Sequence, residues 1–364
     1  MTDVEISPES WEYRLVAAVV IAVDQRLGGT ATAPRTCWTG VVLEESNPDF
    51  LGTAGDDGSM SVSVVNVLEP LRKARDLDRP LTGGEALAIR DAIGTLAHEA
   101  AHLVTELGDP TAPDAYPYDA AAEADNEGRT EYWTHDNLDK IVEDVFPDAG
   151  LEHAVPDVLV QESIDAYPAF TSAVSDIDQA LADRGRLSKE QVTQRLMLAD
   201  DAQRWNVAVD LVIDARLAEP GLMPEADRTE VRRQLVAPLR EALSGLEAVE
   251  SDDWLDDNQK TEASTEAAQK AVAELDRAVN RIERDYRVDG AVRGRRRAPE
   301  IGGRPEHGDL PPELRRLRAL TGAQAGAAGA TARRRDDGGP AEGAWAHGQQ
   351  VDRANTVKPT PGRG

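Results

Sequence analysis

Cysteine is almost absent from this 364-residue chain, in which Cys37 is the only one. A single thiol excludes an internal disulfide, and it also excludes a metal site built from several thiolates. Any metal centre must therefore be made from histidine and carboxylate side chains. The chain offers six histidines for that purpose.

Long hydrophobic runs are missing as well. The most apolar stretch, LVAAVVIAV at residues 15–23, is too short to span a bilayer and predicts a buried helix. The first residues, MTDVEISPES, lack the positively charged start of a signal peptide. We therefore expect a cytoplasmic protein with no membrane partner.

Positive charge is scarce. The chain has 40 Lys and Arg residues and 67 Asp and Glu residues, which gives a net charge of −27. The excess lies in residues 1–288, since the chain from Asp289 onward has 14 basic and 9 acidic residues. Such a body repels nucleic acid and anionic membranes over most of its surface. The composition of a GC-rich genome or a salty cytoplasm explains this charge equally well, and we favour that simpler explanation.

Caps and periodicity predict the elements of the first half. Residues 7–29 predict a helix that starts at Ser7 or Ser10 and ends at Gly28 and Gly29. The alternation of Ser and Val in GSMSVSVVNVL, residues 58–68, predicts a strand with one exposed face.

The clearest helix prediction covers residues 81–110. Thr82 and Glu85 form a candidate capping box, apolar residues recur at helical spacing, and Gly108 with Pro110 ends the pattern. After a loop over residues 109–119, residues 120–146 predict a second helix, broken near Gly128.

The second half is predicted to be almost entirely helical. Residues 156–246 break only at RGRLS and EPGLMPEA, and residues 261–287 form a further helix. Its apolar stripe indicates a helix docked on its own domain rather than a dimer seam, and it comprises Val272, Leu275, Val279, Ile282 and Tyr286. From residue 289 the Gly, Pro, Ala and Arg composition predicts a disordered tail. The oligomeric state is left open.

The residues that carry chemistry lie in GTLAHEAAHLVTELGD, residues 94–109. His98 and His102 are four residues apart, so both imidazoles project from one helix face and reach one tetrahedral cation. Glu99 is offset by one residue and points to the side where a metal-bound water sits. A chance trio on a buried helix is the alternative that this motif alone leaves open.

A third ligand is available downstream in DNEGRTEYW, residues 125–133. Glu127 offers a carboxylate from the second helix, and the chain between it and His102 is long enough for an antiparallel return. Glu131, one turn later on the same face, is placed to accept the free N–H of His98 or His102. Asp125 and Glu123 keep open a fourth ligand, which would close the site.

The pair HEAAH and NEGRTEYW resembles the gluzincins, zinc peptidases with His-Glu-x-x-His on one helix and a glutamate ligand on the next. The NEG triplet is similar to that of the aminopeptidase N family. The spacing of Glu127 and Glu131 is similar to that of thermolysin-like enzymes, with Glu131 where they have aspartate. The resemblance covers roughly residues 58–140. The chain lacks a GAMEN-type exopeptidase motif, which favours an endopeptidase.

The resemblance implies a zincin-like metallopeptidase core with a small edge sheet, which we place at residues 1–150. Together with a helical domain at 151–288 and the disordered tail at 289–364, both indicated by the sequence pattern, this predicts a predominantly α-helical α+β fold. In this family the strand upstream of the active helix pairs with an extended peptide or protein substrate.

The resemblance also implies roles for the motif residues. His98, His102 and Glu127 bind Zn²⁺, and Glu99 acts as the general base of peptide hydrolysis. Two imidazoles and a carboxylate also suit other divalent first-row metals. An oxyanion donor has no motif of its own, and its candidates are Tyr116, Tyr118, Tyr132, His135 and His153. Tyr132 is slightly better explained as a core residue.

The competing hypothesis is an inactive zincin-like scaffold that recruits partners through its helical half and its Arg-rich tail. The run RGRRR, residues 293–297, is a weak candidate for a nucleic-acid contact, because no aromatic residues are interleaved with it. Glu99 argues for catalysis, since a purely structural zinc site has no use for a carboxylate between the two histidines. A protease with one specific protein substrate would suit a cytoplasmic location.

Overall fold

The computed structural model describes residues 4–105, 108–217 and 222–297, and it describes only the backbone of residues 289–297. Contacts divide the chain into one unit that contains the residues up to Arg287 and a second unit that begins at Val288. The protein is mostly helical, at 65 %, with a small mixed sheet near the N-terminus, as the predicted α+β class requires. Among the described residues, no helix is long and apolar enough to cross a membrane.

The described sheet has the strand order β1-β2-β4-β3. Its strands are β1 (Val4–Glu5), β2 (Val42–Glu45), β3 (Gly52–Ala54) and β4 (Met60–Ser63). Strands β2 and β4 are parallel and the other pairs are antiparallel. Strand β3 therefore lies at an edge of the sheet, and β4 lies inside it.

The strand predicted over residues 58–68 is wrong in length and in place. The strand covers only β4, which is an inner strand, and residues Val64–Leu68 form a π-helical turn. The Ser63 hydroxyl accepts a hydrogen bond from the backbone N–H of Asn66 at 3.1 Å. This local cap satisfies the backbone without a partner strand, and the chain turns there into a helix.

The described helices follow one another along the rest of the chain. Their bounds are α1 (Trp11–Arg26), α2 (Glu69–Arg75), α3 (Gly83–His102), α4 (Ala120–Ala149), α5 (Val155–Leu159), α6 (Pro168–Gly185), α7 (Lys189–Met197), α8 (Arg204–Arg216), α9 (Arg228–Ser244), α10 (Glu247–Glu250) and α11 (Asp257–Arg297). Short 3₁₀ turns lie at Glu152–Ala154 and Glu225–Asp227.

The predicted caps are confirmed for α1 and α3. The side chain of Ser10 accepts from the backbone N–H of Tyr13. Thr82 and Glu85 form a reciprocal capping box, and each side chain accepts the backbone N–H of the other residue. Helix α3 ends at His102, earlier than the sequence indicates.

Helix α4 is not broken at Gly128, contrary to the prediction. It runs without interruption from Ala120 to Ala149. A Cβ atom on Gly128 would lie 2.7 Å from the backbone carbonyl of Phe170 in α6. The glycine therefore lets two helices approach closely, and the intact hydrogen-bond ladder outweighs its low helix propensity.

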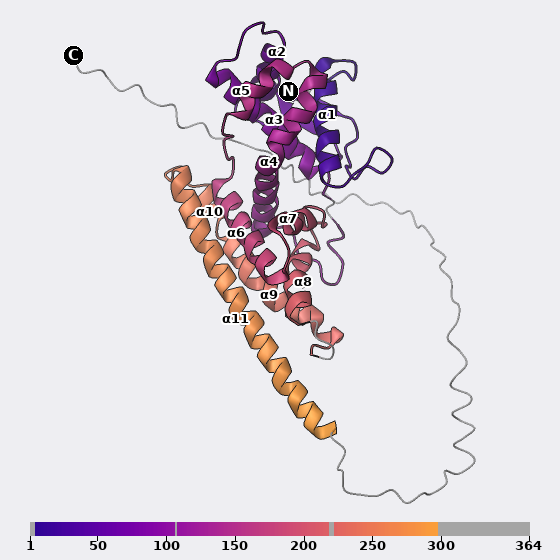
Figure 1. The fold of residues 1–364 in the computed structure, drawn as a ribbon, viewed down its shortest axis with the longest axis vertical. Helices are drawn as coiled ribbons and strands as arrows, with labels where there is room; N and C mark the ends of the chain where they lie inside the picture. The colour runs from indigo at the N-terminus through magenta and orange to yellow at the C-terminus, as the bar shows by residue number, and fades with distance from the viewer. Residues whose placement is uncertain (1–3, 106–107, 218–221, 298–364) are drawn as a thin grey trace, which may run out of the picture. The chain divides into compact units, whose positions relative to one another are not determined.

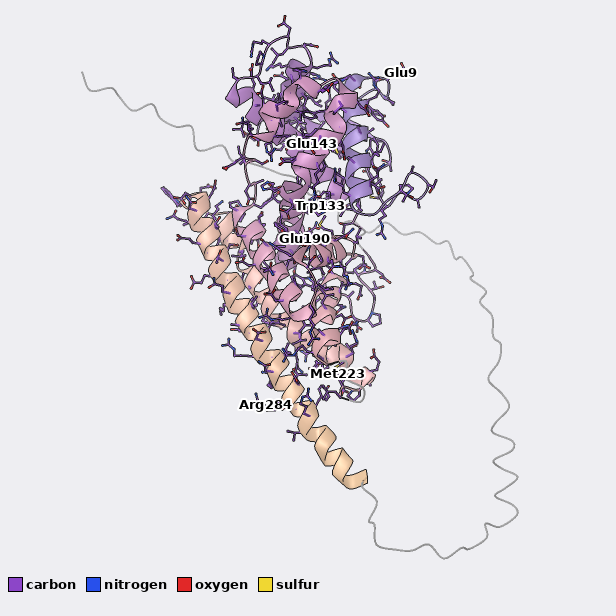
Figure 2. All side chains as sticks on the ribbon, in the orientation of Figure 1. Glu9, Trp133, Glu143, Glu190, Met223 and Arg284 are labelled. Carbon is purple, nitrogen blue, oxygen red and sulfur yellow. The ribbon has the colours of Figure 1, made fainter. Side chains whose placement is uncertain are left out.

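Buried apolar residues form two clusters, and α4 contributes to both. One cluster combines α1, α2, α3 and the sheet with Trp133 and Phe146 of α4. The other combines α6 to α9 and α11 with Ala121 and Ala124 of α4. Figure 1 shows α4 between α3 and α6, and Figure 2 labels Trp133 on it. The predicted domain boundary at residue 150 stays a prediction.

The second half is helical as expected. Ser188 caps α7 after the predicted break at RGRLS, and part of the break at EPGLMPEA, residues 218–221, lies outside the described residues. The stripe residues Leu275, Val279 and Ile282 are buried in the second cluster. Helix α11 continues through residues 289–297, which the sequence assigns to the tail, and residues 298–364 lie outside the described residues.

Candidate metal centre

His98, His102 and Glu127 come together where the end of α3 packs against α4. Their ligand atoms all lie within 4.8 Å of one another. The Nε2 atoms of the two histidines are 3.0 Å apart. Oε2 of Glu127 lies 3.1 Å from Nε2 of His98 and 3.4 Å from Nε2 of His102.

These separations suit a tetrahedral cation. Bonds of about 2.0–2.1 Å at tetrahedral angles place neighbouring ligand atoms about 3.3 Å apart. The three residues expose only 1 %, 9 % and 6 % of their surface. The C-terminal end of α3 adds the negative end of its helix dipole, which favours a cation at the same point. The donor set and its spacing therefore fit a divalent metal ion.

Glu131 orients His98. Its Oε2 lies 2.7 Å from Nδ1 of His98, while its Oε1 accepts from the backbone N–H of Ala166 at 3.0 Å and lies 3.1 Å from Nε2 of His135. With a proton on Nδ1, the N–H of His98 donates to this carboxylate. The lone pair of Nε2 then faces the centre of the cluster. The sequence left open which histidine Glu131 contacts, and the structure shows His98.

Electrostatics in the cluster favour a cation. Burial alone would raise the pKa of the Glu127 carboxyl, but His102 and His98 hold it well below its usual value. Burial alone would lower the pKa of the His98 imidazole, and its hydrogen bonds to Glu127 and Glu131 raise it well above its usual value. The cluster without metal thus holds ionised carboxylates around a proton, which a metal ion can replace.

Glu99 is buried beside this centre, with 1 % of its surface exposed. It is not a member of the group of ligand atoms found among the described residues. The backbone N–H of Ala54 in edge strand β3 donates to its carboxyl. A Cβ atom on Gly52 would lie 2.9 Å from Cγ of Glu99, so only glycine leaves room for this side chain. Burial raises the pKa of Glu99 to about 8.

Tyr167 is the site residue that the sequence missed. Its ring stacks on the imidazole of His98 with centroids 6.0 Å apart, and its hydroxyl donates to Glu127. Tyr167 lies immediately before α6, in the segment DAYPAF, which has no recognisable site motif. It reaches the cluster because α6 packs tightly on α4 at Gly128, which no local pattern reveals.

The other oxyanion candidates have partners outside the cluster or at its margin. The Nζ atom of Lys189 lies over the ring of Tyr132, 4.3 Å from the ring centroid. Nε2 of His153 is 3.1 Å from the backbone carbonyl oxygen of Ala74, to which it is hydrogen-bonded. Tyr116 lies under the guanidinium of Arg240. Tyr118 is hydrogen-bonded to Asn126, and His135 contacts Glu131. Of these five residues, Tyr118 and His135 thus lie next to residues that contact the histidines.

Asn126 links His102 to a buried ionic network. Its amide nitrogen lies 3.3 Å from Nδ1 of His102, and its amide oxygen accepts from Nη1 of Arg204 at 3.0 Å. In this orientation Nδ1 of His102 accepts, and its Nε2 carries the proton. A metal ion on Nε2 requires the other tautomer, which needs an acceptor at Nδ1.

The candidate fourth ligand Asp125 is engaged elsewhere. Its Oδ1 accepts from Nη2 of Arg129 at 2.6 Å, and its Oδ2 lies 3.5 Å from Nη1 of Arg204. It is therefore part of the ionic network and not of the group of ligand atoms around His98.

Comparisons with protein-family models, with curated proteins and with solved structures find no match to this chain. The resemblance to gluzincins therefore rests on the motif residues and on the cluster that they form.

Proposed function

We propose that the protein is a zinc-dependent metallopeptidase of the gluzincin type. The observation that carries the proposal is the convergence of His98, His102 and Glu127, whose ligand atoms lie 3.0–3.4 Å apart. Glu131 supports it, because its bond to Nδ1 of His98 leaves Nε2 free to bind a metal. The same residues carry the HEAAH and NEGRTE resemblance.

A bound zinc ion would supply Lewis acidity, which activates a water molecule and polarises a carbonyl group. Glu99 would accept a proton from a water molecule held in the site and donate it to the leaving amine nitrogen. Its pKa of about 8 applies without a cation, and a divalent ion nearby lowers it, so that the carboxylate is available as a base. The hydroxyl of Tyr167 is the donor we assign to the developing oxyanion.

The substrate we propose is a peptide or protein, cleaved as by an endopeptidase. The strand beside the site is β3, whose Ala54 contacts Glu99, rather than the predicted segment 58–68. As an edge strand, β3 has one side without a partner strand in the described sheet, and an extended peptide is its natural partner.

The decisive experiment measures metal content by mass spectrometry on purified protein. We expect about one zinc per chain in the wild type and in Glu99→Gln, and loss of zinc in Glu127→Ala. Glu143→Ala, an exposed position on the same helix, is the matched control and should keep its zinc. No metal in the wild type, or zinc that survives Glu127→Ala, would disprove the three-ligand site.

A structural metal site in an inactive scaffold is the second candidate, and the burial of the cluster favours it. His98 and Glu99 each expose only 1 % of their surface. Cleavage of a peptide library separates the two candidates. An enzyme loses activity in Glu99→Gln while its zinc stays bound, whereas a scaffold shows no cleavage in either protein.

A further inference from the structure

A cleft of about 960 Å³ opens beside the candidate metal centre. Its floor follows one face of α3, where Gly84, Ala88, Asp91 and Thr95 recur at helical spacing. The next position on that face is His98. The cleft has the size of a ligand pocket, at the upper end of the usual range of about 300–1,000 Å³.

The cleft reaches side chains that touch the candidate ligands. Tyr167 and Glu131 both line it, and both contact His98. Leu51, directly before edge strand β3, lines it as well. A molecule bound in the cleft therefore lies next to the proposed site of hydrolysis.

Carboxylates dominate the charge of the cleft. Lys260 is the one lysine among its lining residues, no arginine lines it, and Nζ of Lys260 already bonds to Glu250 at 3.0 Å. The acidic residues of the lining come from several elements and are Asp91, Glu123, Glu131, Asp165, Glu247, Glu250, Asp253 and Asp257. This excess favours a positively charged ligand.

Thr134 gives an independent indication of a ligand. Its side chain lines the cleft, only 1 % of its surface is exposed, and its hydroxyl has no hydrogen-bond partner among the described residues. A buried hydroxyl without a partner is costly in free energy. A ligand that offers a polar backbone group would satisfy it.

Apolar side chains at the same cleft are exposed to solvent. Ile164 exposes 63 % and Val65 exposes 44 % of its surface, and both line the cleft. Trp254, 94 % exposed, lies next in the chain to the lining residue Asp253. Exposed apolar groups rimmed by charge are typical of a surface that binds a partner.

We propose that this cleft binds an extended polypeptide segment that carries Lys or Arg next to apolar side chains, and that it presents this segment to the His98 centre. The carboxylates pair with the basic side chains, Ile164 and Val65 contact the apolar ones, and Thr134 bonds to the backbone. Presentation for cleavage rests on the proposed function, whereas binding does not.

The test is fluorescence anisotropy with a labelled peptide, Ala-Lys-Leu-Arg-Ile-Ala, and full-length Glu99→Gln protein, which binds without cleavage. A peptide with Glu in place of Lys and Arg is the ligand control and should not bind. Because the ion pairs between the peptide and the cleft would be exposed to solvent, peptide binding should weaken as added salt shortens the Debye length below about 10 Å.

Two charge reversals separate the cleft from the general acidity of the chain. Glu247→Lys with Asp253→Lys should weaken binding roughly tenfold or more, because both carboxylates lie in the lining. Glu143→Lys with Asp148→Lys changes the net charge equally at exposed positions of α4 outside the lining, and Figure 2 labels Glu143 there. Equal weakening in both variants would overturn the proposal.

Thr134→Val tests the hydroxyl, and we expect weaker binding without loss of stability, since the variant removes an unsatisfied buried group. Unchanged binding would count against the peptide backbone contact. Spermidine competes poorly if apolar contacts contribute, and full competition would assign the cleft to small polycations instead.

The proposed function and this inference fail in different ways. If the peptide binds but neither it nor any library member is cleaved by the zinc-loaded wild type, the peptidase proposal is wrong and the cleft assignment stands. If peptides are cleaved without preference for Lys or Arg, and cleavage is insensitive to Glu247→Lys with Asp253→Lys, the cleft assignment is wrong.

Discussion

Helix α4 carries two buried polar clusters on different faces, and they differ in how their charges are balanced. Asp125 and Arg129 belong to an ionic network in which Arg129 also bonds both carboxylate oxygens of Asp178 at 2.6 Å. Glu127 and Glu131, each two residues further along, bond to histidines and to the uncharged donors Tyr167 and the backbone N–H of Ala166, respectively. The network already contains its cations in Arg129 and Arg204, whereas in the histidine cluster the Nε2 atoms of two histidines converge on Oε2 of Glu127. That difference separates an internally neutralised cluster from a candidate metal site.

Removing Arg129 from the network should have the largest effect. Arg129→Met leaves Asp125 and Asp178 buried without their main partner, and breaking a buried pair in this way costs about 3–5 kcal/mol of unfolding free energy. Denaturant unfolding of the metal-free protein measures it. A double variant, Arg129→Met with Asp178→Leu, should recover part of this loss of stability. Equal unfolding free energies of the Arg129→Met variant and the wild type would contradict the network's role.

Zinc bound at the histidine cluster should stabilise the folded protein by mass action. At a free zinc concentration of 100 times the Kd, the gain is about 2.7 kcal/mol, and it should vanish in Glu127→Ala. Thermal unfolding with and without a chelator gives this difference. Arg129→Met, by contrast, should lose stability to a similar extent with and without zinc, and a strong zinc dependence of that loss would show that the two clusters are not independent.

Glu131→Gln weakens the support of His98 without removing a ligand. The amide is a poorer acceptor for the Nδ1 proton, and the loss of such an outer partner typically lowers metal affinity by about 10–100-fold. Competition with a zinc indicator measures the affinity. An unchanged affinity would show that the carboxylate only ties Ala166 and His135 to α4.

Asn126→Asp should act in the opposite direction and by less. An aspartate oxygen accepts the Nδ1 proton of His102, which favours the tautomer that binds metal through Nε2, and it keeps an acceptor for Arg204. We expect zinc to bind a few-fold more tightly, within the range of such outer contacts. Weaker binding in the same competition assay would contradict this account of the tautomer.

The features that could be predicted from the sequence are those set by interactions between residues close together in the chain. The cap at Ser10, the capping box of Thr82 and Glu85 and the spacing of His98 and His102 all act within a few residues. The pairing of His98 with His102 was predictable because helical periodicity fixes which face each side chain occupies. Glu127 was predicted from its motif and from the length of the chain after His102, and the structure brings the three residues together.

Contacts between distant segments were not predictable in this way. The approach of Tyr167 to His98 and the bond of Arg204 to Asn126 depend on how α6 and α8 pack on α4. The strand predicted over 58–68 failed because a serine cap competed with the sheet at Ser63. In each case a tertiary or side-chain contact overrode the local pattern.

Gly128 shows what this means for the tolerance of the chain to mutation. It has no functional group, yet even an alanine there would force the Phe170 backbone away from α4. Tyr167, three residues earlier, would move with it. In a saturation mutagenesis screen scored by activity, position 128 should therefore be as intolerant as the candidate ligand positions His98, His102 and Glu127. Its contribution is an empty volume that sets the distance between two helices.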